Sequence, residues 1–582
     1  MSQPAFLNVE TSALGRRWIG PSIDSERLGL AISQATGFPP VLGQILANRN
    51  VQPEDAAAYL TPSMRELMPN PSTLIDMDKA TERFLQAVDQ KQRIAIFADY
   101  DVDGGASAAL LIVWLRERGI NATLYIPDRI DEGYGPNDEA MAMLGREHDL
   151  IITVDCGTLS HDPIKAAGID VIVLDHHQGG ETLPDAVAVV NPNRQDETGD
   201  LSYLCAAAVV FLLLASANRT LRNRGETGPD LIAMLDLVAL ATVADVAPLI
   251  GFNRALVRQG LSVMANRNRV GLVALSDVAR MNSAPSSYHL GYLLGPRINA
   301  GGRVGAADLG ARLLATNDPS EAEALAERLD ALNTERRDIE ATVQAQATEQ
   351  AEERGVERGL VWAAADGWHP GVVGIVASRL KEAFNRPAVV IGIDGGEGKG
   401  SGRSVNGVDL GSAIATMTRE GLLLKGGGHK MAAGLTISID KLDAAMERLT
   451  ELLEKQGSAN AGPSDLRIDG LISPAGASVE LIENLEQAGP FGASSPAPRF
   501  ALASTRISFA KRAGDSHLRL TLTDGGGGKI DAIAFRAFES DLGPILENHS
   551  GQSFHFAGRL EVDDWGGRRK AKLKLEDAAK AG

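Results

Sequence analysis

The stretch RIAIFADYDVDGG, residues 93–105, decides how the rest of the chain is interpreted. It begins with a short apolar run that ends in an acid, and a segment of helical length, Gly104–Gly119, follows it. Three further apolar runs also end in aspartate, namely Ala122–Asp128, Asp149–Asp155 and Ile169–Asp175. Continuous apolar strands that alternate with helices are typical of a parallel sheet buried on both faces. The sequence therefore predicts an α/β fold built around a parallel sheet.

Acids and histidines gather where these strands end. They are Asp99, Asp101, Asp103, Asp155, Asp175, His176 and His177, together with Asp245 after an apolar, helix-like stretch. Ligands of open parallel sheets bind outside the carboxyl ends of the strands, so we expect these side chains to share one crevice. Several neighbouring carboxylates stay ionised only when cations neutralise them, and otherwise their pKa values rise. The pattern therefore predicts a metal centre.

The residue types indicate both the metal and the reaction. Carboxylate and imidazole without thiolate suit Mn²⁺, with Mg²⁺ as the more oxygen-loving alternative. Two such ions can activate water and hold both oxygens of an in-line phosphoryl displacement, which predicts metal-assisted phosphoester hydrolysis. A single acidic loop or a single His-His pair is more often structural, so the prediction depends on their combination. We interpret Cys156, beside Asp155, as a small residue in a tight turn and not as a nucleophile.

Composition limits the class of protein. The chain has 582 residues and a formal net charge of 57 − 75 = −18, with proportions ordinary for a globular protein. This charge argues against coating DNA or an anionic membrane by bulk attraction, although it allows a local basic cleft. Two cysteines cannot build a disulfide scaffold or a thiolate zinc site. The longest apolar run, Leu204–Ala217, is too short to span a bilayer, and the N-terminus has no signal-peptide core, so we expect a cytoplasmic protein.

Downstream, the pattern changes twice. Residues 317–358 predict one long helix, opened by a capping-box pattern from Ser320 to Glu323, with a coiled-coil dimer as the alternative. Its apolar side chains recur at roughly helical spacing: Leu325, Leu329, Leu332, Ile339 and Val343. A smaller α/β unit and a mostly β segment, expected to be a small barrel, follow. The expected division is a helical lead segment, a catalytic domain, the helix, the smaller unit and the barrel, at 1–75, 76–316, 317–358, 359–457 and 458–582.

Four motifs in order, DYDVDG, VDCG, DHH and ADVAPL, resemble those of the DHH phosphoesterase superfamily. Further motifs resemble its RecJ family of bacterial single-strand-specific 5′→3′ DNA exonucleases, and this resemblance covers nearly the whole chain. They are LGPRINAGGRVGAADLGARLL (294–314), WHPGVVGIVASRL (368–380), GSGRS (400–404) and GGGHKMAAG (426–434). The resemblance implies that the smaller unit is a DHH-associated (DHHA1) domain that closes over the active site. It also implies that the last segment is an oligonucleotide-binding (OB-fold) barrel.

The resemblance also implies roles for single residues. The metal ligands would be Asp101, Asp103, Asp155, His176 and Asp245. Asp99 and His177 would line the same centre, and His177 would contact the scissile phosphate or protonate the leaving oxygen. Asp175 would orient its neighbours. Phe97 stands where many superfamily members carry a ligating histidine, which predicts weaker binding of one ion.

Binding of the DNA strand is expected to involve the second and third domains. Arg403, Ser404 and His429 would bind phosphate among glycines that let backbone N–H groups approach it. Asn299 and Arg303 match the nucleic-acid path by resemblance. In the barrel, Trp565 is a candidate base platform near the basic residues Arg568, Arg569, Lys570, Lys572 and Lys574. Phe554 and Phe556 alternate along a strand and are expected in the core.

The resemblance implies that the protein would be a processive nuclease of DNA recombination and repair, including mismatch repair. It would thread single-stranded DNA between the two α/β domains and release 5′-mononucleotides with two Mn²⁺ or Mg²⁺ ions. Single-strand-binding protein and a RecQ-type helicase are the expected partners, no membrane is involved, and a monomer is the expected state. One alternative is a small-substrate DHH phosphodiesterase acting on dinucleotides or short oligonucleotides, a class that lacks the terminal barrel. The other is a non-catalytic strand-binding relative, a class marked by degenerate metal motifs.

Overall fold

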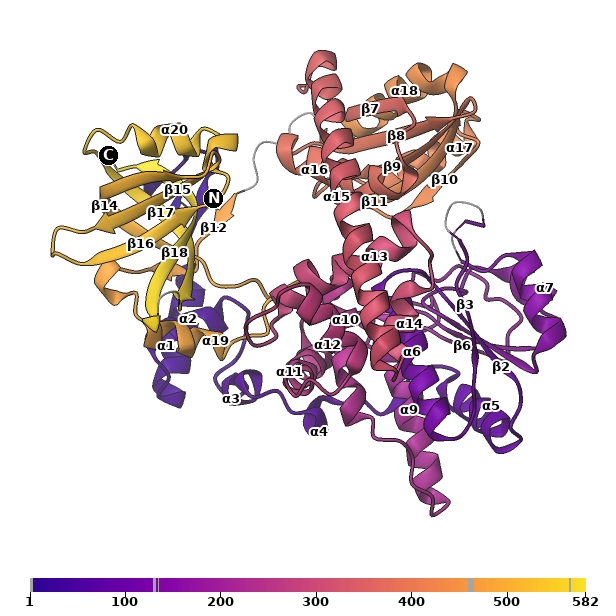
Figure 1. Ribbon diagram of the computed structural model, residues 1–582. Coiled ribbons are helices and arrows are strands. Elements are labelled where there is room, and N and C mark those ends of the chain that lie inside the picture. Colours follow the sequence, from indigo (N-terminus) through magenta and orange to yellow (C-terminus); the bar gives the residue numbers. More distant parts are fainter. Residues whose placement is uncertain (1–3, 129–131, 134, 459–464, 565–566, 582) are drawn as a thin grey trace. The chain divides into compact units, whose positions relative to one another are not determined.

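The computed structural model (Figure 1) describes residues 4–128, 132–133, 135–458, 465–564 and 567–581. The chain forms two compact units. One unit joins Met1–Ser63 to Gly462–Gly582, and the other is Met64–Ala461. This division differs from the five successive segments expected from the sequence, because the first residues of the chain fold with the last.

The larger unit contains a five-stranded, wholly parallel sheet in the order β3-β2-β4-β5-β6. The strands are β2 (Ile94–Ala98), β3 (Thr123–Tyr125), β4 (Leu150–Val154), β5 (Asp170–Leu174) and β6 (Ala188–Val190). Helices α5 (Met77–Asp89), α6 (Val102–Glu117) and α9 (Ala206–Asn223) pack on one face, and α7 (Asp138–Glu147) and α8 (His161–Ala166) on the other. Ile94 and Ile96 point toward the first set, and Ala95 and Phe97 toward the second. Burial of both faces confirms the predicted parallel sheet.

Helices follow the sheet and lead into one long helix. They are α10 (Leu235–Ala244), α11 (Gly251–Ala265), α12 (Val270–Val278), the π-helical turn η4 (His289–Leu294), α13 (Gly295–Val304), α14 (Leu309–Ala315) and α15 (Pro319–Arg354). Helix α15 contacts α12, α13 and α14 and then α16 (Figure 1). Leu325 and Leu329 belong to the core around α6 and α9, whereas Val343 belongs to the core of the next domain. The long helix is therefore confirmed, and its apolar stripe is buried within the chain itself.

The start of α15 corrects one expectation. Asp318, and not Ser320, is the N-cap, and its side chain accepts hydrogen bonds from the backbone N–H groups of Ser320 and Glu321. Pro319 occupies the first helical position, where its missing N–H costs nothing. The aspartate–proline pair therefore sets the helix start two residues earlier than the capping-box pattern predicts.

The second α/β domain has a mixed sheet in the order β10-β11-β9-β8-β7. Its strands are β7 (Val361–Asp366), β8 (Ala388–Asp394), β9 (Glu397–Arg403), β10 (Lys425–Gly428) and β11 (Ala432–Ser438). Only β7 and β8 pair in parallel. Helix α16 (Pro370–Phe384) covers one face, and α17 (Leu410–Arg419) and α18 (Leu442–Glu454) cover the other.

The smaller unit is built on a closed five-stranded barrel. Its strands are β14 (Phe500–Ala513), β15 (His517–Thr523), β16 (Lys529–Ala534), β17 (Ser553–Asp563) and β18 (Lys570–Lys580). The ring closes because β14 pairs with both β15 and β17, and β18 with both β16 and β17. Phe554 and Phe556 are buried inside it, as predicted. The barrel confirms the expected OB-type architecture.

The N-terminal segment completes this unit. Strand β1 (Trp18–Ile19) pairs with β12 (Leu466–Arg467), and the indole of the fully buried Trp18 donates to the Asp577 carboxylate at 3.1 Å. Helices α1 (Ile23–Thr36), α2 (Pro40–Ala47) and α3 (Ala56–Leu60) share a core with α19 (Val479–Glu486) and Phe500. Two further short elements of this unit are β13 (Gly470–Leu471) and α20 (Leu542–Glu547), whereas the short helix α4 (Met64–Leu67) begins the larger unit.

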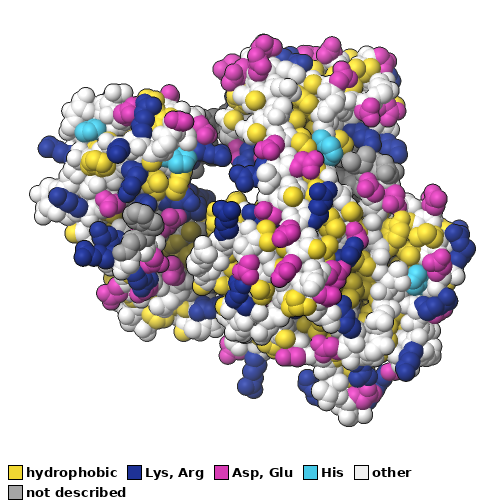
Figure 2. Space-filling view, in the orientation of Figure 1, with side chains coloured by type: hydrophobic (Ala, Val, Ile, Leu, Met, Phe, Trp, Pro, Cys, Tyr) yellow, Lys and Arg dark blue, Asp and Glu magenta, His cyan; other side chains and the backbone are white. Residues whose placement is uncertain are grey.

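The surface charges and the character of the helices add two observations. Acidic and basic side chains are interspersed over the face shown in Figure 2. Among the described residues, no helix has both the length and the apolar character needed to cross a bilayer.

We expect Trp18→Phe to lower the free energy of unfolding of the smaller unit by about 1–3 kcal/mol, because the buried Asp577 carboxylate loses a donor. Urea unfolding followed by circular dichroism measures the change. The control is the same substitution in an Asp577→Asn background, where a neutral amide is cheaper to leave unpaired. Equal costs in both backgrounds would contradict the assigned hydrogen bond.

Candidate metal centre

Seven acids and histidines meet at the carboxyl edge of the parallel sheet. Their ligand atoms form three overlapping groups, and within each group the atoms lie within 4.8 Å of one another. The groups are Asp155, His176 and His177; Asp103, His176 and Asp245; and Asp99, Asp101 and Asp155. The structure therefore brings together all the residues that the sequence predicts at this centre, apart from Asp175, which lies directly beside it.

The loop between β2 and α6 presents its acids through local hydrogen bonds. Asp101 is the N-cap of α6, and its Oδ1 accepts from the backbone N–H groups of Asp103 at 2.9 Å and Gly104 at 3.1 Å. The carboxylate of Asp103 is buried and accepts from the first N–H groups of α9, those of Ala206 at 2.7 Å and Ala207 at 2.8 Å. Each carboxylate oxygen has a second lone pair, so both acids keep the capacity to bind a cation.

His176 lies among three acids that come from different elements. Its Nε2 is 3.2 Å from Asp155 Oδ1 and 3.7 Å from Asp103 Oδ2, and its Nδ1 is 3.9 Å from Asp245 Oδ2. Asp155 has a left-handed backbone with φ of 60°, a conformation that costs energy for a residue other than glycine. The surrounding structure therefore holds Asp155 in place, with its N–H donating to the Leu174 carbonyl at 2.9 Å.

The protein alone does not support ionisation of all these acids. Burial, followed by the negative charges of the neighbouring aspartates, raises the pKa of Asp155 well above its ordinary value. Burial also raises the pKa of Asp103, and burial together with the charges of Asp103 and Asp101 raises the pKa of Asp245 to about 8. Divalent cations would remove this penalty, and the oxygen-and-imidazole donor set fits Mn²⁺ or Mg²⁺.

Asp175 and His177 form a separate pair at the edge of the centre. Asp175 Oδ1 accepts from the backbone N–H groups of His176 at 2.7 Å and His177 at 3.1 Å and from His177 Nδ1 at 2.8 Å, and its Oδ2 accepts from the Thr158 N–H at 3.1 Å. Burial alone would lower the pKa of His177, but the hydrogen bond and charge of Asp175 raise it to about 9. Asp175 therefore orients both histidines and favours an imidazolium at His177.

Asn191 and Asn193 hold the same histidines and were missed in the sequence. Asn191 Nδ2 donates to Thr158 Oγ1 and to the His177 carbonyl, each at 2.8 Å, and Asn193 Nδ2 donates to the His176 carbonyl at 2.6 Å. Both lie just beyond β6, so they follow a strand end as the acids do. The signal is the motif NPNR at residues 191–194, whose asparagines follow a strand end but are also ordinary turn residues.

Cys156 and Phe97, which lie close to the metal centre in sequence, are both buried and have structural roles. Cys156 is buried, and burial followed by the charge of Asp175 raises the pKa of its thiol well above the ordinary value, which agrees with its interpretation as a turn residue. Phe97 is fully buried and stacks on Tyr125, with ring centroids 5.5 Å apart.

The predicted phosphate-binding residues lie on different sides of β9. Ser401 and Arg403 face α16, where a side chain at Gly374 would meet Ser401 Oγ at 3.0 Å and an Arg403 nitrogen at 3.2 Å. Ser404 points the other way, and its buried hydroxyl donates to the Val408 carbonyl at 2.8 Å. Side chains alternate between the two faces of a strand, so Ser401 and not Ser404 lies on the same face as Arg403. Ser401 was not predicted from the sequence, which favoured Ser404 for this position.

The remaining predicted strand-binding residues are spread over the chain. Asn299 Oδ1 accepts from the Val102 N–H at 3.0 Å, and Arg303 donates to the Gly371 carbonyl at 3.0 Å, so α13 links the metal loop to the second α/β domain. His429 is exposed between β10 and β11. Trp565 lies outside the described residues.

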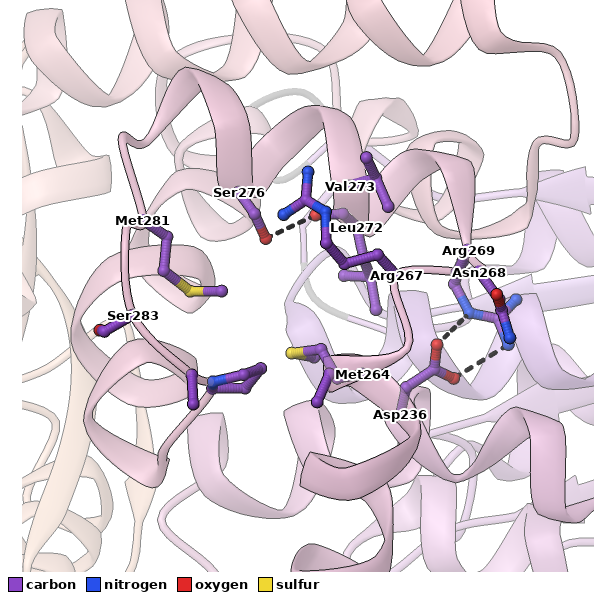
Figure 3. Close-up of a pocket in the computed structure, with 13 residues that line it drawn as sticks. Asp236, Met264, Arg267, Asn268, Arg269, Leu272, Val273, Ser276, Met281 and Ser283 are labelled. Atoms are coloured by element: carbon purple, nitrogen blue, oxygen red, sulfur yellow. Dashed lines mark hydrogen bonds and ion pairs between the residues drawn. The ribbon is translucent and has the colours of Figure 1, made fainter.

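A cavity of about 200 Å³ elsewhere in this unit has a different character (Figure 3). Met264, Leu272 and Met281 line it, and the ion pair between Asp236 and Arg269 lies at its edge. None of the metal-centre residues borders it, so it is not part of that site.

A parallel sheet with acids and a DHH sequence at its carboxyl edge, joined through a long helix to a second α/β domain, defines a DHH phosphoesterase. Family models agree: the DHH family N-terminal domain matches residues 93–242, the DHHA1 domain 357–455 and the RecJ OB domain 468–577. Single-stranded-DNA-specific exonuclease RecJ of Dickeya dadantii is 37% identical over 93% of this chain and 96% of its own length, and that of Escherichia coli is 36% identical with the same coverage. The chain belongs to the RecJ family.

Solved structures agree with this assignment. RecJ of Thermus thermophilus in complex with Mn²⁺ superimposes with a TM-score of 0.80 at 28% identity, covering 97% of this chain and 79% of that one. Exonuclease RecJ bound to manganese gives a TM-score of 0.58 at 34% identity, covering 67% of this chain and 96% of that one. The predicted fold class and the predicted Mn²⁺ or Mg²⁺ cofactor are thereby confirmed.

We expect Mn²⁺ binding to become tighter as pH rises from 6 to 8, by about tenfold per pH unit for each proton released. Raised pKa values mean that the metal-free folded protein holds protons that the unfolded chain has lost, so its stability falls as pH rises through these values. Metal ions displace those protons. Calorimetric titration in buffers of different ionisation enthalpy measures the release, which should be smaller in Asp245→Asn. Affinity independent of pH would contradict the assigned pKa directions.

We expect Asn191→Ala to reduce nuclease activity by about 10- to 100-fold, because the backbone of His177 loses its support. Thr220→Ala is the control, since the Thr220 hydroxyl bonds only one turn back within α9. Steady-state rates on single-stranded DNA, together with melting temperatures, separate a loss of positioning from a loss of folding. An Asn191→Ala enzyme as active as the control would show that this hydrogen bond is dispensable.

Proposed function

We infer that this protein is a metal-dependent, single-stranded-DNA-specific exonuclease that removes 5′-mononucleotides from the 5′ end in DNA recombination and repair. The observation that carries the inference is the convergence of seven acids and histidines in a chain of the RecJ family. The barrel at residues 468–577 counts against a small-substrate phosphodiesterase, and the filled metal positions count against a non-catalytic relative.

Five side chains are proposed as the metal ligands: Asp101, Asp103, Asp155, His176 and Asp245. Asp99 would line the same centre. Two bound Mn²⁺ or Mg²⁺ ions would supply an activated water and neutralise the phosphate oxygens in the transition state. The chain's part is to hold these donors at fixed positions, through the starts of α6 and α9 and the strained backbone of Asp155.

His177 is proposed to act on the phosphodiester itself. Its Nδ1 is bound to Asp175, so its Nε2 edge is the one that can hold a phosphate oxygen or give a proton to the leaving O3′. The bond between phosphorus and O3′ of the terminal nucleotide breaks, and water supplies the new oxygen on phosphorus. The released nucleotide keeps its 5′-phosphate, and the shortened strand begins with a new one.

The second α/β domain is proposed to hold the strand. Arg403 and Ser401, beside the first turns of α16, would bind a phosphate together with His429, which lies next to the start of α17. Asn299 and Arg303 lie on the helix that connects this domain to the metal loop. A passage that admits one strand but not a duplex would give the single-strand specificity. We also propose that the enzyme acts as a cytoplasmic monomer, with single-strand-binding protein and a RecQ-type helicase as partners.

The test uses a long single strand with Mn²⁺, either blocked and labelled at its 5′ end or labelled at its 3′ end with a free 5′-phosphate. Wild type should shorten only the free 5′ end, and Asp101→Ala should reduce the rate by at least about 10²–10³-fold, as loss of a principal electrostatic group does. Asp162→Ala, an exposed acid at the start of α8, is the matched control and should retain full activity. Cleavage confined to dinucleotides, or equal rates on blunt duplex, would overturn the proposed function.

A further inference from the structure

Two exposed tyrosines stack on each other at the turn that precedes α13. Tyr288 is 61% exposed and Tyr292 is 75% exposed. Their ring centroids are 5.4 Å apart, and the planes of the two rings differ by 21°. Isolated apolar residues on a surface need no explanation, but a pair of prestacked aromatic rings is an organised feature. Neither ring is among the groups proposed to hold the metal ions or the phosphates.

The turn that carries this aromatic pair packs against the end of α10, the helix that leads into Asp245 of the metal centre. Tyr292 lies in η4 between two glycines, and a side chain at Gly291 would meet Val243 at 3.3 Å, whereas one at Gly295 would meet Ala244 at 3.3 Å. Val243 and Ala244 end α10, immediately before Asp245. The absence of side chains at the two glycines therefore lets the turn bearing Tyr292 pack closely against the side chains of Val243 and Ala244, two residues and one residue before this acid.

Hydrogen bonds hold the turn at both ends. The His289 ring accepts from the Ser286 N–H through Nδ1 at 3.1 Å and contacts the Ser283 hydroxyl through Nε2 at 3.2 Å. Beyond the turn, Arg297 donates to the Leu293 carbonyl at 2.7 Å and pairs with Asp330 at 2.8 Å. The tyrosines thus project from a fixed backbone, so little ordering entropy would be lost when a ligand binds them.

Other exposed apolar side chains also adjoin the acidic centre. Val246, 69% exposed, follows Asp245, and Leu159, 60% exposed, follows Thr158, whose N–H donates to Asp175. A cation-binding centre with an apolar, aromatic border suits a ligand that carries both phosphate and flat rings. A single DNA strand has this character, because its bases expose faces that a duplex hides within its stack.

We propose that Tyr288 and Tyr292 form a platform on which a base of the single-stranded substrate stacks beside the metal centre. The inference rests on the proposed function and adds a binding site for the base to a site otherwise built for phosphate. The two rings already stack on each other, so the base extends the stack at the more exposed ring, that of Tyr292. Every base has such a face, so the platform does not select a sequence.

The test compares Tyr292→Leu, which keeps apolar bulk without a ring, with Tyr292→Phe, which keeps the ring. Each protein is titrated with fluorescent 5′-phosphorylated single strands in EDTA, and KM and kcat are measured on the same strands in Mn²⁺. One strand is intact, and the others each lack a single base, at successive positions from the 5′ end. Ile439→Ala, which removes an exposed apolar side chain from the second α/β domain, is the control for general surface effects.

For wild type, one missing base near the 5′ end should weaken binding about tenfold, within the range measured for base–aromatic stacking. Tyr292→Leu should weaken binding of the intact strand by a similar factor, raise KM more than it lowers kcat, and lose the penalty at that position. Tyr292→Phe and Ile439→Ala should behave as wild type, and unchanged melting temperatures would show that the fold is intact.

The outcomes separate this inference from the proposed function. If wild type binds the strand but does not cleave it, the proposed function fails, and the binding data still decide the platform. If Tyr292→Leu binds the intact strand as tightly as wild type, or keeps the penalty for the missing base, the platform is overturned. In that case the aromatic pair is better explained as a contact surface for another protein.

Discussion

The structure depends on one electrostatic constraint: five carboxylates and two imidazoles meet where the strands of a parallel sheet end. Burial makes their charges costly, and the raised pKa values of Asp155 and Asp245 express that cost. The fold offsets part of it with the first N–H groups of α6 and α9, and divalent cations offset the remainder. The residues around the centre consequently serve to orient its carboxylates and imidazoles.

Much of this centre could be predicted because the acids follow a rule that is visible in sequence. Asp99, Asp155 and Asp175 each end an apolar run, and parallel strands end at a common edge, so these acids could be placed together without coordinates. Asn191 and Asn193 obey the same rule but escaped notice, because asparagine after a strand is also ordinary turn chemistry. Ser401 and Ser404 could be distinguished only once the alternation of β9 was known.

Long-range pairing sets the limit of sequence analysis in this chain. Trp18 donates to Asp577, 559 positions away, and the local sequence around either residue does not predict that the two segments pair. The five expected segments therefore do not anticipate that the first 63 residues fold with the barrel. The long helix α15 was predictable because its signal is local periodicity, although its start depends on the cap of Asp318, which a neighbouring capping-box pattern obscured.

Binding of a polyanion by a chain of net charge −18 cannot depend on bulk attraction. In the proposed function, phosphate is bound instead by metal ions and by a few placed cations such as Arg403, and contacts of this kind weaken as salt concentration rises. Stacking of bases on Tyr288 and Tyr292 would supply affinity that salt does not screen, at a distance from the acids that a phosphate must approach. An acidic protein can therefore bind an acidic DNA strand if cations hold its phosphates and aromatic rings hold its bases.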